Sequence, residues 1–168
     1  MHKGILVLAV GLVSLVAFAA DPALPIPKEG SISFVNVLSG NVVRMALGKD
    51  RLQLSYDIMG VSTSPTGEGL LHNASVRCVG GLHIVNGAWD DASGSCIYTR
   101  PDGDQVFAIY RDAGKVGVPI KGTFTFVGGT GKMAGITGGG EFTRVSVRPA
   151  AEGTLQSAAR YTAKYKLP

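Results

Sequence analysis

Residues 121–144 contain the motif GGTGK, which resembles a phosphate-binding loop. A P-loop has the pattern GxxxxGK followed by serine or threonine. One glycine therefore lies five residues before the glycine of the GK pair. The backbone of such a loop wraps the phosphates, and the hydroxyl holds magnesium. In this chain Phe126 and Met133 occupy the two positions. The motif therefore does not predict a P-loop.

A dinucleotide-binding fingerprint fits the same run more closely, because Gly129, Gly131 and Ala134 match GxGxxA after a predicted strand. That fingerprint needs a helix directly after it, since the helix N-terminus holds the pyrophosphate. The next residues, MAGITGGGEF, contain four glycines. Each glycine would destabilise a helix by about 1 kcal/mol. We therefore expect no nucleotide and no other cofactor.

Glu141 is the candidate catalytic residue of the segment GEFTRVSVR, where it would share one face of a strand with Val145 and Val147. If that face points inward, the carboxylate lies in the interior or at its mouth and could orient a ligand or act as a base. The alternative is that Glu141 caps the strand end in solvent, paired with Lys132 or Arg111.

Five tyrosines could supply hydroxyl groups to a binding site: Tyr56, Tyr98, Tyr110, Tyr161 and Tyr165. Tyrosines of this kind are more often core or rim aromatics than acid catalysts. Those that lined a cavity would suit an apolar ligand with one polar group. Tyr56, Tyr98 and Tyr110, together with Glu141, are the predicted ligand-binding residues.

Cys78 and Cys96 are the two cysteines of the chain. In an exported protein two free thiols would meet an oxidising compartment, so we predict one structural disulfide. The chain-entropy model gives about 3 kcal/mol for a loop of this length. A catalytic or metal-binding pair is the alternative, but the spacing is not CxxC, and His72 and His83 fit no ligand pattern.

Trp89 lies in the segment NGAWDDASGS, which is interpreted as a loop. Such a loop could cover one end of the fold, or Asp90 and Asp91 could bind calcium. Isolated aspartate pairs are common, so no metal site is predicted. The basic residues are scattered, without runs or interleaved aromatics, and a nucleic-acid partner is not predicted either.

The first twenty residues have the features of a secretory signal: Lys3, an apolar run over residues 5–18, and small residues after it. A membrane anchor needs about 20 apolar residues, and this run is shorter. We predict a signal peptide over residues 1–20, cleaved near Ala19 or Ala20, and a periplasmic or secreted mature protein without a membrane span.

The remaining sequence predicts an extended, proline-rich leader over residues 21–30 and one all-β domain over residues 31–168. RLQLSYDIM alternates apolar and polar residues, and PDG between GSCIYTR and DQVFAIYR predicts a hairpin. About eight short strands predict a sandwich or a closed antiparallel β-barrel, and a barrel leaves no exposed edge. The last segment, TLQSAARYTAKYK, fits a strand or a helix.

VGGTGKMAGITGGGEF resembles the glycine-rich hairpin of allene oxide cyclases, plant dirigent proteins and bacterial exported proteins with the same barrel. CIYTRPDGDQVFAIYR is similar to the segment before that hairpin in the bacterial proteins, so the resemblance spans about a third of the chain. It implies an eight-stranded calycin-like barrel with an apolar lumen, often a trimer. In the enzymes of this superfamily, the barrel steers the cyclisation or coupling of a reactive hydrophobic intermediate. None of their site residues matches a position here.

Three functions fit these observations. The first is an exported, non-catalytic barrel that binds a small apolar ligand or a partner, in its lumen or on its rim. The second is a cyclase or isomerase acting on a lipid-derived or polyketide-like substrate. The third is a structural, homo-oligomeric envelope protein. A lumen packed with bulky side chains would exclude the ligand-dependent functions, because ligand sites need a cavity.

Overall fold

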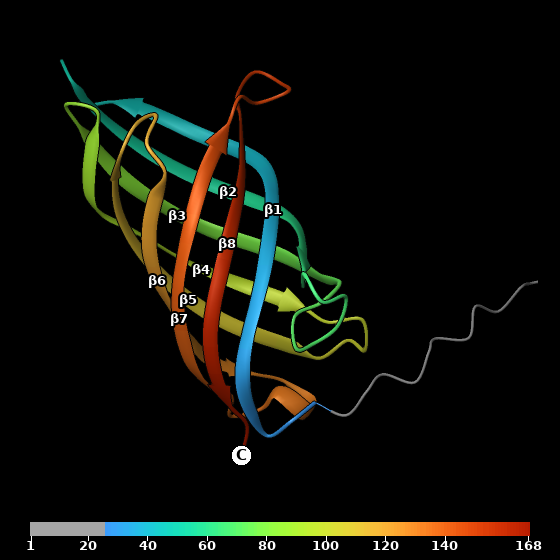
Figure 1. The fold of residues 1–168 in the computed structure, drawn as a ribbon. Helices are drawn as coiled ribbons and strands as arrows, with labels where there is room; N and C mark the ends of the chain where they lie inside the picture. Colours follow the sequence, from blue (N-terminus) through green and yellow to red (C-terminus); the bar gives the residue numbers. More distant parts are fainter. Residues whose placement is uncertain (1–25) are drawn as a thin grey trace, which may run out of the picture.

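The computed structural model describes residues 26–168, so the predicted signal peptide and residues 21–25 of the predicted leader lie outside the described residues. Within this range eight antiparallel strands form a closed barrel in which each strand pairs with its neighbours in the sequence (Figure 1). The strands are β1 (Glu29–Ala46), β2 (Arg51–Thr63), β3 (Ala74–Val85), β4 (Ala88–Thr99), β5 (Gln105–Lys115), β6 (Ile120–Gly129), β7 (Thr137–Val147) and β8 (Thr154–Lys166). The prediction of a closed eight-stranded antiparallel barrel is confirmed.

Pairing between β1 and β8 closes the barrel. The first pair joins Glu29 to Lys166, so the end of the predicted leader belongs to the barrel. The last segment of the chain is a strand, not the helix that its sequence left open. Its small and aromatic residues alternate inward, with Ala159, Tyr161 and Ala163 buried, and a strand buries every second residue on one face.

Residues 121–144 form β6, a short 3-10 turn η1 (Gly131–Met133) and the first part of β7. The 3-10 turn connects the two strands of this glycine-rich hairpin. Gly131 has φ 51°, and a side chain there would collide with the Asp104 carboxylate, which accepts a hydrogen bond of 2.9 Å from the backbone N–H of Lys132. The glycine thus serves a tight turn.

Aromatic side chains fill the lumen on the η1 side. Phe34 stacks on Tyr161 with ring centroids 4.6 Å apart. It also forms T-shaped contacts with Tyr98 and Phe124, whose ring centroids lie 6.0 Å and 5.9 Å from its own. Each such pair contributes about 0.5–1.5 kcal/mol beyond its buried area. This half of the lumen is a packed core.

Loops and the chain terminus seal the barrel at this end, which we call the closed end. The residues that cover it are all buried: Leu70, Leu71, Met133, Ile136 and Leu167. Arg100 donates a hydrogen bond to the Leu70 carbonyl and pairs with Asp102 at 3.2 Å. Burial alone would raise the pKa of Asp102, but hydrogen bonds from Arg100 and Lys132 outweigh it and lower that pKa.

The other end, which we call the hairpin end, carries the turns between β1 and β2, β3 and β4, β5 and β6, and β7 and β8 (Figure 1). Among the described residues no helix is long and apolar enough to cross a membrane.

Candidate functional site

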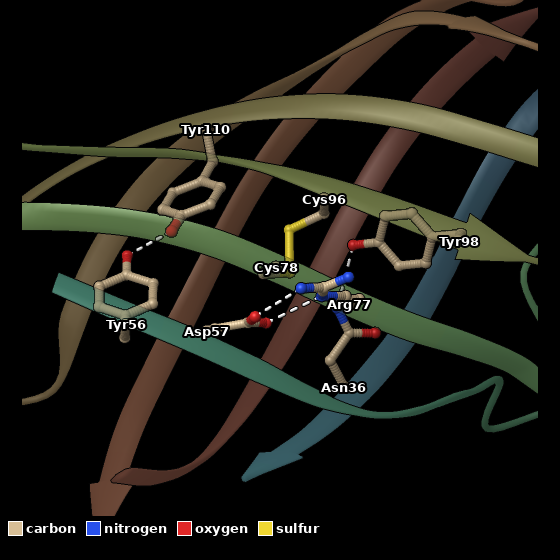
Figure 2. Close-up of a disulfide and its surroundings, with 8 residues drawn as sticks. All are labelled: Asn36, Tyr56, Asp57, Arg77, Cys78, Cys96, Tyr98 and Tyr110. Atoms are coloured by element: carbon tan, nitrogen blue, oxygen red, sulfur yellow. Dashed lines mark hydrogen bonds and ion pairs between the residues drawn. A yellow bond between two sulfur atoms is a disulfide. The ribbon is translucent and has the colours of Figure 1, made fainter. Parts of the chain in front are cut away.

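The three predicted ligand-binding tyrosines all point into the lumen, at two levels (Figure 2). Tyr56 of β2 and Tyr110 of β5 share a hydroxyl–hydroxyl hydrogen bond toward the hairpin end. Tyr98 of β4 lies closer to the closed end, where its hydroxyl accepts a hydrogen bond of 3.0 Å from Asn36 Nδ2. The structure therefore brings two of the three hydroxyls together.

Glycines in the lumen wall make room for the aromatic side chains. A Cβ at Gly80 would come within 2.8 Å of the Tyr56 hydroxyl, and one at Gly114 would come within 2.8 Å of the Trp89 ring. A Cβ at Gly122 would collide with Phe142. These positions hold glycine because any side chain there would displace an aromatic ring.

A buried ion pair lies beside the tyrosines, toward the hairpin end. Arg144 of β7 donates a hydrogen bond of 2.9 Å to Asp112 Oδ2, and Trp89 Nε1 donates one of 2.7 Å to Asp112 Oδ1. The Asp112 side chain is fully buried and that of Arg144 is 12% exposed. No motif in the sequence marks Asp112 as a site residue. Its spacing of two from Tyr110 is the signal that could have placed both on one face.

Trp89 belongs to β4 and not to the predicted loop. The pairing of β4 with β5 shifts register between Trp89 and Ala92, which breaks the alternation that marks a strand. Asp90 and Asp91 are exposed beside it. Residues 26–168 contain no group of three or more His, Cys, Asp or Glu side chains placed to hold a metal ion.

The lumen holds one small cavity of about 20 Å³, lined by Arg144, Ser157, Tyr110 and Phe142 among others. That volume admits a single water molecule, whereas sites for drug-sized ligands measure about 300–1,000 Å³. Two buried polar atoms among its lining residues, Arg144 Nε and Ser157 Oγ, have no hydrogen-bond partner in the described chain. Bulky side chains therefore fill the space around this cavity, and a packed lumen argues against the ligand-dependent functions.

Burial sets the protonation of the lumen tyrosines. It raises the pKa of Tyr56 and of Tyr110 above the usual value of 10.0, and it raises the pKa of Tyr161 to about 12. Their hydroxyls stay protonated at neutral pH, because the charged phenolate is disfavoured in a low-dielectric interior. They can donate hydrogen bonds but are not poised to act as bases.

The predicted disulfide is confirmed. Cys78 and Cys96 face each other across β3 and β4 and form a disulfide with Cα atoms 4.1 Å apart. Both cysteines are buried and line the small cavity. In Figure 2 the bridge lies between the Tyr56–Tyr110 pair and the Asn36–Tyr98 pair.

Glu141 lies on the outer wall of the barrel and is exposed, as the solvent alternative expected, so it lacks the inward orientation that a catalytic role would need. Val145 and Val147 also point outward, while Phe142 and Arg144 point inward. Burying the Phe142 ring favours this arrangement, and Asp112 neutralises the arginine that comes with it. Lys132, one proposed partner of Glu141, pairs with Asp102 at 3.2 Å instead.

The outer wall has two chemically different sides. Around Glu141, β6 to β8 form a polar depression of about 610 Å³ that also includes Lys121, Arg160 and three threonines. On β1 to β5, six aliphatic side chains point outward and are 44–57% exposed: Val37, Met59, Val61, Val79, Ile97 and Ile109. We call these six residues the apolar belt.

The charged pair at the centre of the apolar belt is internally neutralised. Arg77 binds Asp57 through two hydrogen bonds, of 2.9 Å and 2.6 Å (Figure 2). The Arg77 guanidinium lowers the pKa of Asp57. Contiguous exposed apolar surface on a folded protein marks interaction sites, so the belt is a second candidate site.

No protein-family model and no curated protein matches the sequence. Among solved structures, the chain is similar to that of the pterocarpan synthase dirigent protein GePTS1. The two share 11% sequence identity over 92% of this chain and 99% of that chain, with a TM-score of 0.49. At this identity and TM-score the similarity says nothing about activity.

Proposed function

We propose that the mature protein is an exported, non-catalytic barrel that acts through its outer surface, with the apolar belt as the contact face of a homo-oligomer. The cavity of about 20 Å³ beside Arg144 and Tyr110 supports this proposal best, because it is too small for an apolar ligand in the closed barrel. A binding surface outside the barrel remains.

A second copy of the chain suits the apolar belt better than a charged partner does. The belt exposes aliphatic side chains, and its charged pair, Arg77 and Asp57, is already matched. This matched pair therefore adds no repulsion between like charges when two copies approach through the face. The polar wall around Glu141 would stay in solvent.

Native mass spectrometry of the mature protein from its own cells tests this proposal. We expect an oligomer that retains no small molecule. The variant Val61→Lys/Val79→Lys should weaken association about a hundredfold or more, because it buries charge in an apolar contact. Thr143→Lys/Thr162→Lys adds the same charge to the polar side of the wall and should leave the oligomer intact. A monomeric wild type, or equal effects of the two variants, would contradict the proposal.

A small ligand in the lumen is a second candidate, and with it a cyclase or isomerase. Arg144 Nε and Ser157 Oγ support it, since neither has a hydrogen-bond partner within residues 26–168 and both residues line one cavity with Tyr110. Such a ligand would need the Phe142 or Tyr161 ring to move. A retained small molecule in the native mass spectrum would favour this candidate over the belt.

The proposed export has its own test, because it depends on residues 1–20. Cell fractionation should place the protein outside the cytoplasm, and its N-terminal sequence should begin near Ala20 or Asp21. An intact N-terminus in the cytoplasm would overturn the proposed location.

A further inference from the structure

Three turns at the hairpin end form one continuous rim (Figure 1). The turn between β3 and β4 connects its neighbours: the Asn86 N–H donates a hydrogen bond of 2.9 Å to the Asp50 carbonyl, and the Gly87 carbonyl accepts one of 2.9 Å from the Val116 N–H. The turns therefore hold fixed positions relative to one another. We call residues 43–51, 85–88 and 115–118 the hairpin rim.

The hairpin rim exposes aliphatic side chains on protruding turns. Six of them are 38–68% exposed: Val43, Met45, Leu47, Val85, Val116 and Val118. At the closed end, by contrast, the covering aliphatic residues are buried. Leu47, Val85, Val116 and Val118 lie in or beside the turns, whereas Val43 and Met45 lie on β1 before its turn. The exposed set therefore offers separate points and not a groove for a peptide or helix.

Basic side chains accompany these tips. Arg44, Lys49, Arg51 and Lys115 lie in the rim with one carboxylate, Asp50. All four cations are exposed, and within residues 26–168 none of them forms an ion pair. The basic residues lie beside the turn between β3 and β4 on both of its neighbouring strands, since Arg51 of β2 pairs in register with Val85, and Lys115 of β5 with Ala88.

We propose that the hairpin rim docks on a negatively charged phospholipid surface. The aliphatic tips enter the interface between headgroups and acyl chains, while the surrounding lysines and arginines bind the lipid phosphates. The rim carries its basic side chains on separate turns, which complements a broad anionic plane better than an acidic pocket of a protein. The proposal goes beyond the apolar belt, which lies on the barrel wall, and neither depends on the other.

Flotation of the mature protein with vesicles tests the docking. We expect binding to mixed phosphatidylglycerol–phosphatidylcholine vesicles, weakening as salt rises, and little binding to pure phosphatidylcholine. Each rim cation near an anionic surface accounts for about fivefold in affinity. Lys49→Gln/Lys115→Gln should therefore weaken binding roughly 25-fold. Val116→Ser/Val118→Ser should weaken it about tenfold or more, because less apolar area is buried.

Matched variants away from the rim control for general charge and hydrophobicity. Lys164→Gln/Lys166→Gln removes the same charge from the closed half of β8, and Val127→Ser removes an exposed valine from β6, outside both the hairpin rim and the apolar belt. Both should bind vesicles like the wild type. Circular dichroism should show that all variants stay folded, since every altered side chain is exposed.

Equal losses in the rim and control variants would overturn the docking proposal, and so would equal binding to neutral and anionic vesicles. Failure to bind any vesicle, combined with rim-dependent binding to a purified protein, would assign the rim to a protein partner. Since Val61→Lys/Val79→Lys tests the oligomer separately, failure of the lipid proposal leaves the belt proposal standing, and the reverse.

Discussion

Leu71 at the closed end is 2% exposed, whereas Leu47 in the hairpin rim is 47% exposed. The same contrast holds between the other residues that cover the closed end and the other five exposed residues of the hairpin rim. A barrel needs one well-packed core for stability but does not need both ends sealed. The closed end therefore serves stability. The exposed aliphatic and basic side chains of the hairpin rim fit the proposed docking surface.

The interior of the barrel also differs between the closed end and the hairpin end. Toward the closed end the lumen is packed with rings such as Phe34 and Tyr161, and toward the hairpin end it holds the Asp112–Arg144 pair. Buried ion pairs contribute little net stability compared with apolar packing, but they become costly when one partner is lost. The two halves should therefore respond differently to substitution.

The largest expected effect is that of Asp112→Ala in the polar half. It leaves the Arg144 guanidinium buried without its partner and Trp89 Nε1 without an acceptor, which should cost about 3–5 kcal/mol of unfolding free energy. Urea unfolding measures it. Asp112→Ala/Arg144→Met removes both charges and should recover most of the loss. If the double variant is less stable than Asp112→Ala, the cluster has a role that the ion pair does not explain.

The next effect compares one substitution at the two ends. Leu71→Ala should cost about 2–5 kcal/mol, because it opens a cavity in the packed closed end. Leu47→Ala should change stability by about 0.5 kcal/mol or less, since exposed positions contribute little. Thermal and urea unfolding of the pair measure the difference. Similar losses would show that the hairpin rim is part of the core.

The disulfide should contribute somewhat less, because it joins neighbouring strands that already pair. Cys78→Ser/Cys96→Ser should cost about 2–3 kcal/mol, mainly through a less restricted unfolded chain. Both sulfurs are buried in the lumen between the two halves, so a reductant should reach them only on unfolding. Thiol titration in native buffer with reductant checks this. Rapid reduction without loss of structure would mean that the lumen opens.

Much of the fold could be predicted from the sequence, because strand alternation, turn residues and export chemistry are local signals. The strands and the disulfide follow from them, whereas the choice of a closed barrel over a sandwich also depended on the resemblance of the glycine-rich hairpin within residues 121–144. The exclusion of a nucleotide motif depended on the residues after it. Such patterns state which residues share a face.

The orientation of each face could not be predicted in the same way. Whether Glu141 or Arg144 points inward depends on the ring of Phe142 and on Asp112, which lies on β5, separated from β7 by β6. A lone arginine in a strand is expected outside, and its partner becomes a neighbour only when the barrel closes. The same holds for the Tyr56–Tyr110 contact and for Trp89, where a register shift hides the strand.

The smallest expected effect is that of tyrosine ionisation on stability. It should be absent at neutral pH and appear only in alkali. Burial raises the pKa of all five above the usual value of 10.0. Below pH 10 both native and unfolded chains keep these protons, so stability is unaffected. Above it only the unfolded chain loses protons readily. Stability should therefore fall as pH rises from about 10 through the folded pKa values.

Tyrosinate absorbance shows whether the two halves are equally closed. In the native protein we expect no ionisation near pH 10, and a rise only together with loss of the circular dichroism signal. Tyr161→Phe should make the alkaline loss of stability shallower, because its pKa is raised to about 12 and one ionising group disappears from the unfolded chain. Early ionisation that Tyr110→Phe abolishes would show that solvent enters through the hairpin end. The polar half of the lumen would then be accessible to solvent. The small cavity volume would no longer disfavour a ligand in the lumen.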